Sequence, residues 1–490
     1  MVYRGVPSKG CLECRKRKTR CDLQKPSCAK CSLKNRVCSG YRNELDLMFF
    51  HEYSDVARRV QAKEKIQANE QSHMLFDRQM QSSISPRLLP IDIKDAATNF
   101  YFENFTHLGR PEGLGSYLPK LYNKGGPDTV FKNAVIAVGM AGLANIAKNP
   151  IMRQAARQQY VAAISKVNEA LSRPSRPTED GVVMSVMMLS MFETMTCCHI
   201  KSRETWIEHI KGAVSLIALR GENQFHNETG RSIFLYMRSN IISSCLQREV
   251  VVPELLCHWS MKAQVDDSID RRKGNELMNI VTRFANLRAL LKDGLLTDAS
   301  DIVLTALAIE QDLIIWLEDL SPAFIFTTTS VETATEMAYG SHCHIYEHLW
   351  AAFNINTYRT THLMIHSMIL ECLVPYATST HPVGLIQNPA SQYQKSLEAS
   401  HYLGAEIAAS LPFHLGFSKS SGMPPPYKRT PIAGGLFSLW PLYILGSTSS
   451  IPEDLRAWSA ERLIMIGKTM GIQTASMLAW VVGMTMGTNP

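Results

Sequence analysis

The sequence lacks the features that mark exported and membrane-spanning proteins. Its first residues, MVYRGVPSKG, contain no apolar segment like that of a secretory signal peptide, so we expect no export and reduced cysteines. No apolar run reaches the length of about 18 residues that spans a bilayer. The runs VVMSVMMLSMF at 182–192 and SMLAWVVGM at 476–484 are shorter and predict buried core helices.

Catalytic signatures are missing as well. The chain contains no G-x-x-x-x-G-K-[ST] phosphate loop, no G-x-S-x-G elbow and no strand followed by G-x-G-x-x-G. Alternating strand patterns are essentially absent, whereas apolar residues at helical spacing are frequent from about residue 90 onward. We therefore expect a mostly α protein that is not an enzyme.

Acidic residues are scarce in one segment only. Residues 1–43 hold 12 Lys or Arg and 2 Asp or Glu, so the net charge of +7 arises entirely in this segment and the remainder is slightly acidic. Concentrated positive charge points to a polyanionic partner, with nucleic acid ahead of an anionic membrane surface. The remainder is long enough to bury a large core.

Six of the 12 cysteines form two copies of C-x2-C-x6-C. They are Cys11, Cys14, Cys21, Cys28, Cys31 and Cys38. In a reducing compartment such spacing indicates structural zinc, which four ligands surround tetrahedrally. A single zinc ion bound by the C-x2-C pair of each copy would leave Cys21 and Cys38 without a role. Two zinc ions would use all six sulfurs, provided that two of the sulfurs bridge both metals.

This segment resembles the binuclear zinc cluster of fungal transcription factors. The likeness includes Arg15 directly after the second cysteine, a basic run before the third, and Pro26 in the spacer. The resemblance implies that Cys11 and Cys28 bridge two zinc ions. The remaining ligands that it implies are Cys14 and Cys21 for one ion, and Cys31 and Cys38 for the other. The segment is too small for an apolar core, so we expect zinc to hold it together.

Five of the six residues between the second and third cysteines are basic: Arg15, Lys16, Arg17, Lys18 and Arg20. The resemblance implies that this run contacts a CGG triplet in the major groove of DNA. Lys18 is our first candidate for base contact, with Arg17 beside it, and the other three are candidates for phosphate contact. A plain nuclear-import signal or solvated face is the alternative, but it would leave the cysteine repeat unexplained.

The segment 44–85 is predicted to be a linker, helical in part around 54–68. Its apolar residues Val56, Val60 and Ile66 do not keep the heptad register of a coiled coil. Dimerisation through this segment is therefore not predicted, and the sequence leaves the choice between monomer and homodimer open.

Three apolar patterns in the remainder predict helices with recognisable ends. The pattern through Tyr160 follows Asn149 and Pro150, a helix cap and first-turn proline. A second pattern ends at Gly221, a suitable glycine for a helix C-terminus. A third runs from Ile309 to Leu320, and further periodic positions are Ile164, Val167, Leu171, Ile207, Ile210, Val214, Ile217, Leu313 and Trp316.

The stretch HIKGAVSLIALRG at 209–221 resembles a segment of the regulatory domain found in one branch of the same fungal family. Its Gly212 and Ala213 are interpreted as close contacts between helices. We accordingly expect a zinc-cluster domain over 1–43, a linker over 44–85 and an all-helical regulatory domain over 86–490.

Other metal-binding residue types show weaker patterns. His344 and His348 are four residues apart, as are His362 and His366, a spacing that zinc sites on helices use. No H-E-x-x-H motif accompanies them, so we interpret them as capping, stacking or solvent-facing histidines. The remaining cysteines have no ligand spacing and are interpreted as buried thiols: Cys197, Cys198, Cys245, Cys257, Cys343 and Cys372.

Together these features predict a fungal, nuclear, sequence-specific regulator of RNA polymerase II genes that binds two zinc ions and double-stranded DNA. Transcription co-regulators and a small-molecule effector are further partners that we consider, and no membrane partner is expected. One alternative is a helical metabolite receptor or enzyme whose basic zinc module serves localisation or RNA binding. Another is a scaffold that binds DNA without specificity. The basic run inside a six-cysteine repeat favours the regulator.

Overall fold

The computed structural model describes residues 11–38 and 92–487, with gaps. The gaps are 18, 20, 23, 25–26, 35, 37, 107–116, 125, 127–128, 174–177, 198–202, 264–267, 331–337, 380 and 418–430. The chain forms two compact units, Met1–Leu88 and Leu89–Pro490, here called the cluster unit and the helical unit. The linker expected at 44–85, with its helical stretch and unmet heptad register, lies outside the described residues.

The cluster unit contains two short helices in its described part, α1 (Leu12–Lys16) and α2 (Ala29–Ser32). Each helix begins directly after the first cysteine of one C-x2-C-x6-C copy. The buried apolar residues described here are four of the cysteines. Such a unit has too little apolar surface to fold by burial alone.

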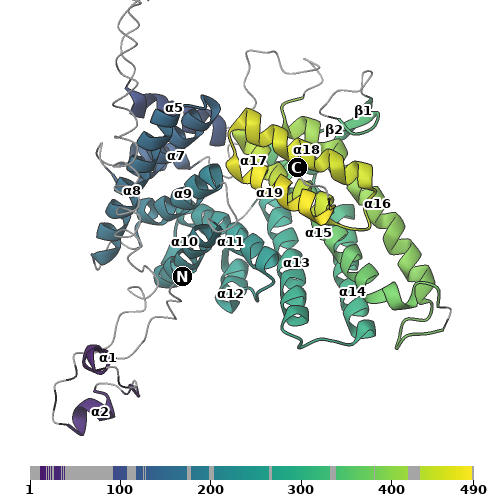
Figure 1. Ribbon diagram of the computed structural model, residues 1–490, viewed down its shortest axis with the longest axis horizontal. Coiled ribbons are helices and arrows are strands. Elements are labelled where there is room, and N and C mark those ends of the chain that lie inside the picture. Colours follow the sequence, from purple (N-terminus) through teal and green to yellow (C-terminus); the bar gives the residue numbers. More distant parts are fainter. Residues whose placement is uncertain are drawn as a thin grey trace, which may run out of the picture. The chain divides into compact units, whose positions relative to one another are not determined.

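The helical unit consists mainly of α-helices, as the sequence predicted (Figure 1). They are α5 (Ile93–Phe105), α6 (Leu118–Asn123), α7 (Val130–Ile146), α8 (Pro150–Ser172), α9 (Asp180–Thr196), α10 (Arg203–Arg220), α11 (Glu228–Arg248), α12 (Glu254–Ala263), α13 (Ile269–Lys292), α14 (Ala299–Glu318), α15 (Leu349–Leu373), α16 (Pro389–His414), α17 (Ile432–Ser447), α18 (Glu453–Met470) and α19 (Gln473–Thr485). Among the described helices, none has both the length and the apolar character to cross a membrane.

Local chemistry accounts for several helix ends. The Asn149 side chain accepts hydrogen bonds from the backbone N–H groups of Ile151 and Met152, and Pro150 occupies the first turn of α8, which confirms the predicted start. At the end of α10, Gly221 has a φ of 58°, a left-handed conformation that glycine adopts without strain. Both ends were therefore encoded within a few residues of sequence.

The core of the helical unit is built around α7 and α9, whose residues are buried along most of their length. Helix α7 packs against α5, α8 and α9. A side-chain Cβ at Gly139 of α7 would overlap the carbonyl oxygen of Ala97 in α5, so only glycine permits this close approach of the two backbones. The apolar runs at 182–192 and 476–484 lie in α9 and α19, confirming them as core helices.

The two ends of the helical unit's sequence pack against each other. In Figure 1 the last helices, drawn in yellow, reach from α16 toward α9, and α19 contacts α9 while α17 contacts α5. The buried amide of Asn145 donates hydrogen bonds to the backbone oxygens of Met195, at 2.7 Å, and of Gly471, at 2.8 Å. The hydrogen bond from Asn145 to Gly471 and the packing of α17 on α5 join segments more than 300 residues apart into one core.

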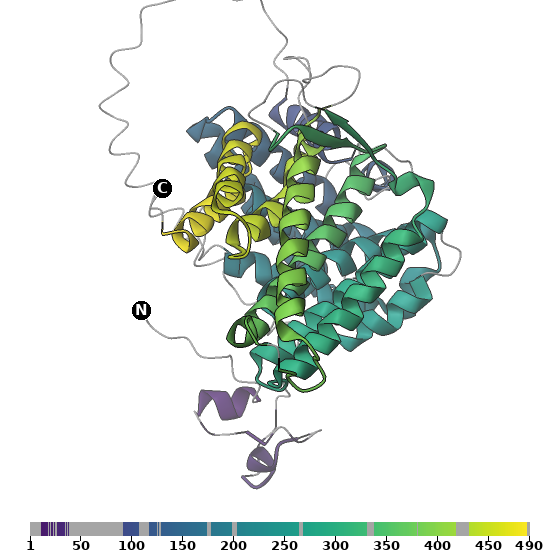
Figure 2. The ribbon, with the colours of Figure 1, turned by 90° about the vertical axis from the view of Figure 1, so that its right-hand side faces the viewer.

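A small hairpin departs from the all-helical expectation. Strand β1 (Thr327–Ser330) pairs antiparallel with β2 (His342–Ile345), and the pair packs against α16, as the turned view in Figure 2 also shows. His344 therefore lies in a strand, while His348 caps α15 by accepting a hydrogen bond from the N–H of Ala351 at 3.0 Å. The helical spacing assigned to this pair was therefore wrong, whereas the interpretation of His348 as a capping histidine is confirmed.

The cysteines of the helical unit differ from one another in burial. Cys197, Cys245 and Cys343 are buried thiols, as predicted. Cys257 is exposed on α12 and Cys372 is half-buried, so the prediction was wrong for Cys257. Cys198 lies outside the described residues.

Candidate zinc cluster and nucleic-acid interface

The two cysteine repeats share one local backbone arrangement. In the first repeat the Cys11 sulfur accepts a hydrogen bond from the N–H of Cys14 at 3.4 Å, and in the second the Cys28 sulfur accepts one from the N–H of Cys31 at 3.4 Å. Each C-x2-C pair thus forms the first turn of a helix, which turns both of its sulfurs to the same side. The two copies of the cysteine repeat therefore have the same local structure.

The chain after each helix also returns in the same way. The N–H of Thr19 donates to the carbonyl oxygen of Cys14 at 2.9 Å, and the N–H of Arg36 donates to that of Cys31 at 3.0 Å. Both hydrogen bonds span five residues. They end the two helices at equivalent points and direct the chain toward the third cysteine of each repeat.

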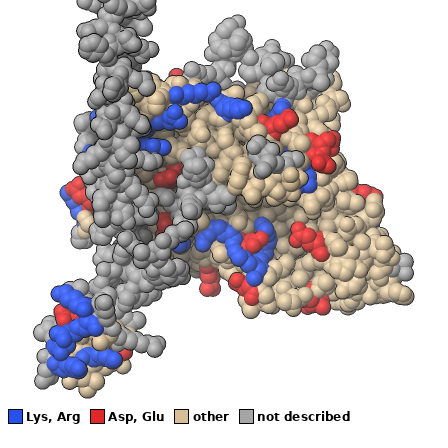
Figure 3. Space-filling view, viewed as in Figure 1, with Lys and Arg blue, Asp and Glu red and all other residues tan. Residues whose placement is uncertain are grey.

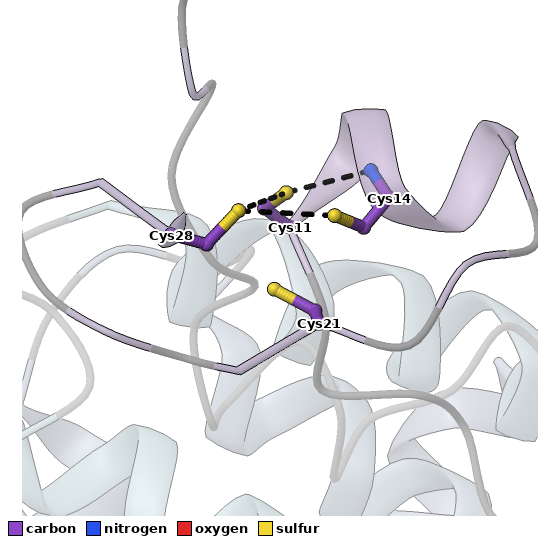
Figure 4. Close-up of side chains that lie close together, drawn as sticks. All are labelled: Cys11, Cys14, Cys21 and Cys28. Carbon is purple, nitrogen blue, oxygen red and sulfur yellow. Dashed lines mark hydrogen bonds between the residues drawn. The ribbon is translucent and has the colours of Figure 1, made fainter. Parts of the chain in front are cut away.

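The six sulfurs fall into two groups of four, each with its ligand atoms within 4.8 Å of one another. One group is Cys11, Cys14, Cys21 and Cys28, and the other is Cys11, Cys28, Cys31 and Cys38. The two groups share Cys11 and Cys28. Figure 4 shows the first group, whose sulfur atoms point toward one another.

The spacing of the sulfurs fits tetrahedral zinc. Zinc–thiolate bonds of about 2.3 Å place the corners of a regular tetrahedron about 3.8 Å apart. The Cys11 sulfur lies 3.7 Å from those of Cys28 and Cys31, and the Cys14 sulfur lies 3.7 Å from that of Cys28. All three separations are thus suitable for two sulfurs on one metal.

Crowding of the thiols affects their acidity. Desolvation by burial is the largest cause that raises the pKa of Cys28, and the neighbouring sulfurs of Cys31, Cys11 and Cys14 act in the same direction. A metal-free cluster would therefore hold protons that zinc must displace. We expect zinc binding to release protons and to weaken in acid.

One acidic side chain that the sequence analysis passed over connects the two repeats. Asp22, the residue after Cys21, accepts a hydrogen bond from the N–H of Ala29 at 3.0 Å. Ala29 is the first residue of α2, so a carboxylate from the first repeat faces the N-terminus of the second repeat's helix, where negative charge is favourable. The sequence signal for this contact was an acidic residue directly after the third cysteine.

The basic run begins on α1 and continues past its end. Lys16 and Arg17 are exposed, and Arg15 lies between Cys14 and Lys16 in the same helix. Arg17 lies 3.9 Å from the Glu13 carboxylate, an exposed ion pair of little energetic weight. Lys and Arg side chains cover much of the described surface of this unit in Figure 3.

Two of the five predicted DNA-contacting residues, Lys18 and Arg20, lie outside the described residues. Thr19, between them in sequence, is described, and the hydrogen bond from its N–H to the carbonyl oxygen of Cys14 holds Thr19 itself next to the cluster. The described residues therefore combine a sulfur cluster with the exposed basic side chains of Lys16 and Arg17. Such a surface suits the phosphate groups of a nucleic acid.

Two protein families match the chain. Residues 9–47 match the fungal Zn(2)-Cys(6) binuclear cluster domain, and residues 129–482 match the fungal specific transcription factor domain. The first range contains all six cysteines of the repeat, and the second covers most of the helical unit.

Curated relatives match over shorter stretches. Transcription factor dbaG of Emericella nidulans is 34% identical over 101 residues, which is 19% of this chain and 24% of the relative. An uncharacterised protein of the same organism is 27% identical over 119 residues, 24% of this chain and 25% of the relative. The chain therefore spans about a quarter of the length of these relatives, and no solved structure matches it.

Proposed function

Because the chain belongs to the fungal transcription factors that combine a Zn(2)-Cys(6) cluster with a fungal specific transcription factor domain, we propose that it acts in the nucleus as a sequence-specific regulator of RNA polymerase II genes. Its DNA target contains a CGG triplet. The observation that carries this proposal is a pair of exposed basic side chains, Lys16 and Arg17, directly after a turn that supplies the sulfurs of Cys11 and Cys14 to the cluster.

The two sulfur groups support a proposed set of zinc ligands. In this proposal Cys11 and Cys28 bridge the ions, in keeping with their place in each group of four. The other ligands are Cys14 and Cys21 for one zinc, and Cys31 and Cys38 for the second. When bound, the two zinc ions supply the folding free energy that this small unit cannot obtain from an apolar core.

The roles within the basic run follow from the chemistry of DNA recognition. Lys18 and Arg17 contact guanine in the major groove, where Lys and Arg are the usual partners of the guanine O6 and N7 atoms. Arg15, Lys16 and Arg20 contact phosphates and fix the orientation of the module. The thiolate cluster behind the run carries net negative charge, which reduces the repulsion among these cations.

The wider division of the chain is part of the same proposal. Residues 1–43 bind DNA, residues 44–85 link the two units, and residues 86–490 regulate the protein's activity through co-regulators or an effector. The helical unit is not an enzyme in this account. Both matched families are transcription factor domains, which supports this assignment.

A competition experiment tests the DNA-binding proposal. The full chain, loaded with zinc, is titrated with a labelled duplex that contains CGG, and competed with unlabelled CGG duplex, a duplex of the same composition with the triplet scrambled, and single-stranded RNA. We expect the CGG duplex to compete at least tenfold better than the other two. Equal competition by the scrambled duplex would favour a non-specific scaffold, and stronger competition by RNA would favour the localisation or RNA-binding alternative.

A hollow in the helical unit supports a small-molecule effector. It has a volume of about 70 Å³ and is lined mainly by residues of α11, α13 and α15, including Arg238, Arg271, Asn275 and Trp350. Arg238 is 1% exposed and donates a hydrogen bond to the Asn275 side-chain oxygen at 2.8 Å. Guanidinium groups at a partly apolar wall suit a small organic anion such as a carboxylate.

Thermal unfolding of the full chain with millimolar formate or acetate, which are small enough for this hollow, tests this effector class. We expect at least one of these acids to raise the melting temperature of the helical unit, and Arg238→Gln to abolish the rise. A rise that survives this substitution, or no rise with either acid, would contradict an anion site at Arg238.

A further inference from the structure

Two histidines and one glutamate converge between α14 and α15 of the helical unit. Glu310 lies on α14, and His362 and His366 lie one turn apart on α15, which packs beside α14 (Figure 1). One carboxylate oxygen of Glu310 lies 3.1 Å from Nε2 of His362 and 3.2 Å from Nε2 of His366. All three ligand atoms lie within 4.8 Å of one another.

Hydrogen bonding explains only part of this arrangement. His362 and Glu310 are aligned for a hydrogen bond. Nε2 of His366 is almost as close to the same oxygen but lacks the alignment, and neither ring nitrogen of His366 has a hydrogen-bond partner although the side chain is 3% exposed. A buried imidazole with two unpartnered nitrogens is costly, so the site calls for another partner.

A metal ion would explain why both imidazoles face the same carboxylate although only His362 is aligned for a hydrogen bond. A hydrogen bond requires the N–H to point at the acceptor, whereas ligation requires the lone pairs of several atoms to converge on a point between them. Zinc–nitrogen and zinc–oxygen bonds of about 2.0–2.2 Å place tetrahedral ligands about 3.3–3.5 Å apart. The two measured separations between Glu310 and the imidazoles lie just below this range.

The surroundings also suit ligation. Nδ1 of His362 lies 3.2 Å from the Tyr358 hydroxyl, a contact of the kind that fixes the ring of a metal-bound histidine from behind. The Glu310 side chain is 17% exposed, which leaves an entry from solvent.

We propose that Glu310, His362 and His366 bind one divalent transition-metal ion of the zinc class, with a further coordination position open to solvent. Imidazole and carboxylate together favour zinc and its neighbours over calcium or magnesium. The ion would join α14 to α15 and so make the stability of the helical unit depend on metal. This site is separate from the cysteine cluster and does not depend on the DNA-binding proposal.

Zinc content of the full chain tests the site. Protein is loaded with zinc, freed of unbound metal by gel filtration, and measured by plasma mass spectrometry against protein concentration. We expect three zinc ions per chain, and two in each of the variants Glu310→Gln and His366→Gln. The matched control is His401→Gln, an exposed histidine on α16, which should retain three.

The two cluster ions serve as an internal standard in this experiment. Two zinc ions per chain in the unaltered protein, or three in both site variants, would overturn the proposal, whereas failure of the cluster would appear as a loss below two. Circular dichroism shows whether each variant keeps its helices, and His362→Gln replaces any variant that does not. In thermal unfolding, added zinc should raise the melting temperature of the unaltered helical unit but not that of Glu310→Gln.

Discussion

The cluster unit and the helical unit are stabilised in different ways. Among the described residues of the cluster unit, the buried apolar set consists of four cysteines, whereas the helical unit has an extensive core centred on α7 and α9. The first has the chain's excess positive charge and the second is slightly acidic. The cluster unit therefore depends on zinc in place of a core and is able to attract DNA. The helical unit depends mainly on apolar burial, to which the proposed ion between α14 and α15 would add, and it has no comparable need for a polyanion.

Removal of metal should separate the two units most sharply. With a strong chelator, the full chain should lose all specific binding to a CGG duplex, because the cluster unit unfolds, while most of its helical signal in circular dichroism remains. Added zinc should restore binding. Specific binding that persists after complete removal of zinc would contradict the account.

Two cysteine substitutions probe bridging within the cluster unit. Cys28→Ser should lower the zinc content by two ions per chain, because its sulfur belongs to both groups of four. Cys14→Ser should directly remove a ligand from one group only, so one ion should be lost first. Mass spectrometry of the intact chain under native conditions counts the ions. An equal loss of one ion in both variants would contradict bridging by Cys28.

A glycine substitution should damage only the helical unit. Gly139→Ala places a Cβ against the Ala97 carbonyl oxygen and should lower the free energy of unfolding by about 1–3 kcal/mol. Gly126→Ala is the matched control, since nothing lies within 4 Å of a Cβ there. Chemical denaturation followed by circular dichroism measures both. Zinc content and DNA affinity should be unchanged in both variants, and a loss of DNA affinity in Gly139→Ala would show that the units are not independent.

Within the basic run, base contact and phosphate contact should be distinguishable. Lys18→Ala should reduce discrimination between CGG and scrambled duplexes by about 1–3 kcal/mol. Lys16→Ala should weaken binding to both duplexes alike and reduce the salt slope by about one unit, because one fewer counterion is released. Binding at several salt concentrations, with zinc content checked, separates the two. If Arg17→Ala rather than Lys18→Ala removes discrimination, the base contact is at Arg17.

Mild acid should weaken the helical unit through a buried histidine. His414 accepts a hydrogen bond from the Asn356 amide at 3.0 Å, and burial is the main cause that lowers its pKa to about 3. The unfolded chain takes up this proton near pH 6.5, so stability is present above that pH and is lost as pH falls toward 3.

The expected loss from His414 is about 2 kcal/mol between pH 6.5 and pH 5. Denaturation at both pH values measures it, and His414→Gln should remove this part of the pH dependence. His381→Gln, at an exposed histidine, is the control. An unchanged pH dependence in His414→Gln would exclude His414 as its source.

Sequence reasoning succeeded where a feature is determined by residues that are close together in the chain. The cysteine repeat and the cap at Asn149 each lie within a few tens of residues, so their spacing indicated a two-zinc cluster and predicted the start of α8. The division of the six sulfurs into two groups was implied by the family resemblance and not by the spacing. The β1–β2 hairpin is too short to produce a recognisable strand pattern in the sequence. His344 of this hairpin packs on Phe326, with ring centres 4.4 Å apart, and the spacing of residues in the sequence does not predict this contact. Its His-x3-His spacing was therefore mistaken for a helix.

The convergence of Glu310 with His362 and His366 was out of reach for the same reason. The glutamate precedes the first histidine by 52 residues, and only the packing of α14 on α15 brings them together. The histidine spacing alone gave no grounds for a metal, because such pairs occur on many helices. Side-chain chemistry assembled by tertiary packing has to be observed in the structure.

Selection from a random duplex library tests the central claim most directly. The zinc-loaded full chain is incubated with the library at physiological salt, bound duplexes are amplified over several rounds, and the enriched sequences are compared with those from Cys28→Ser treated identically. The account predicts enrichment of a CGG triplet by the unaltered chain and none by the variant. Enrichment of no common sequence, or the same enriched triplet in Cys28→Ser, would contradict it.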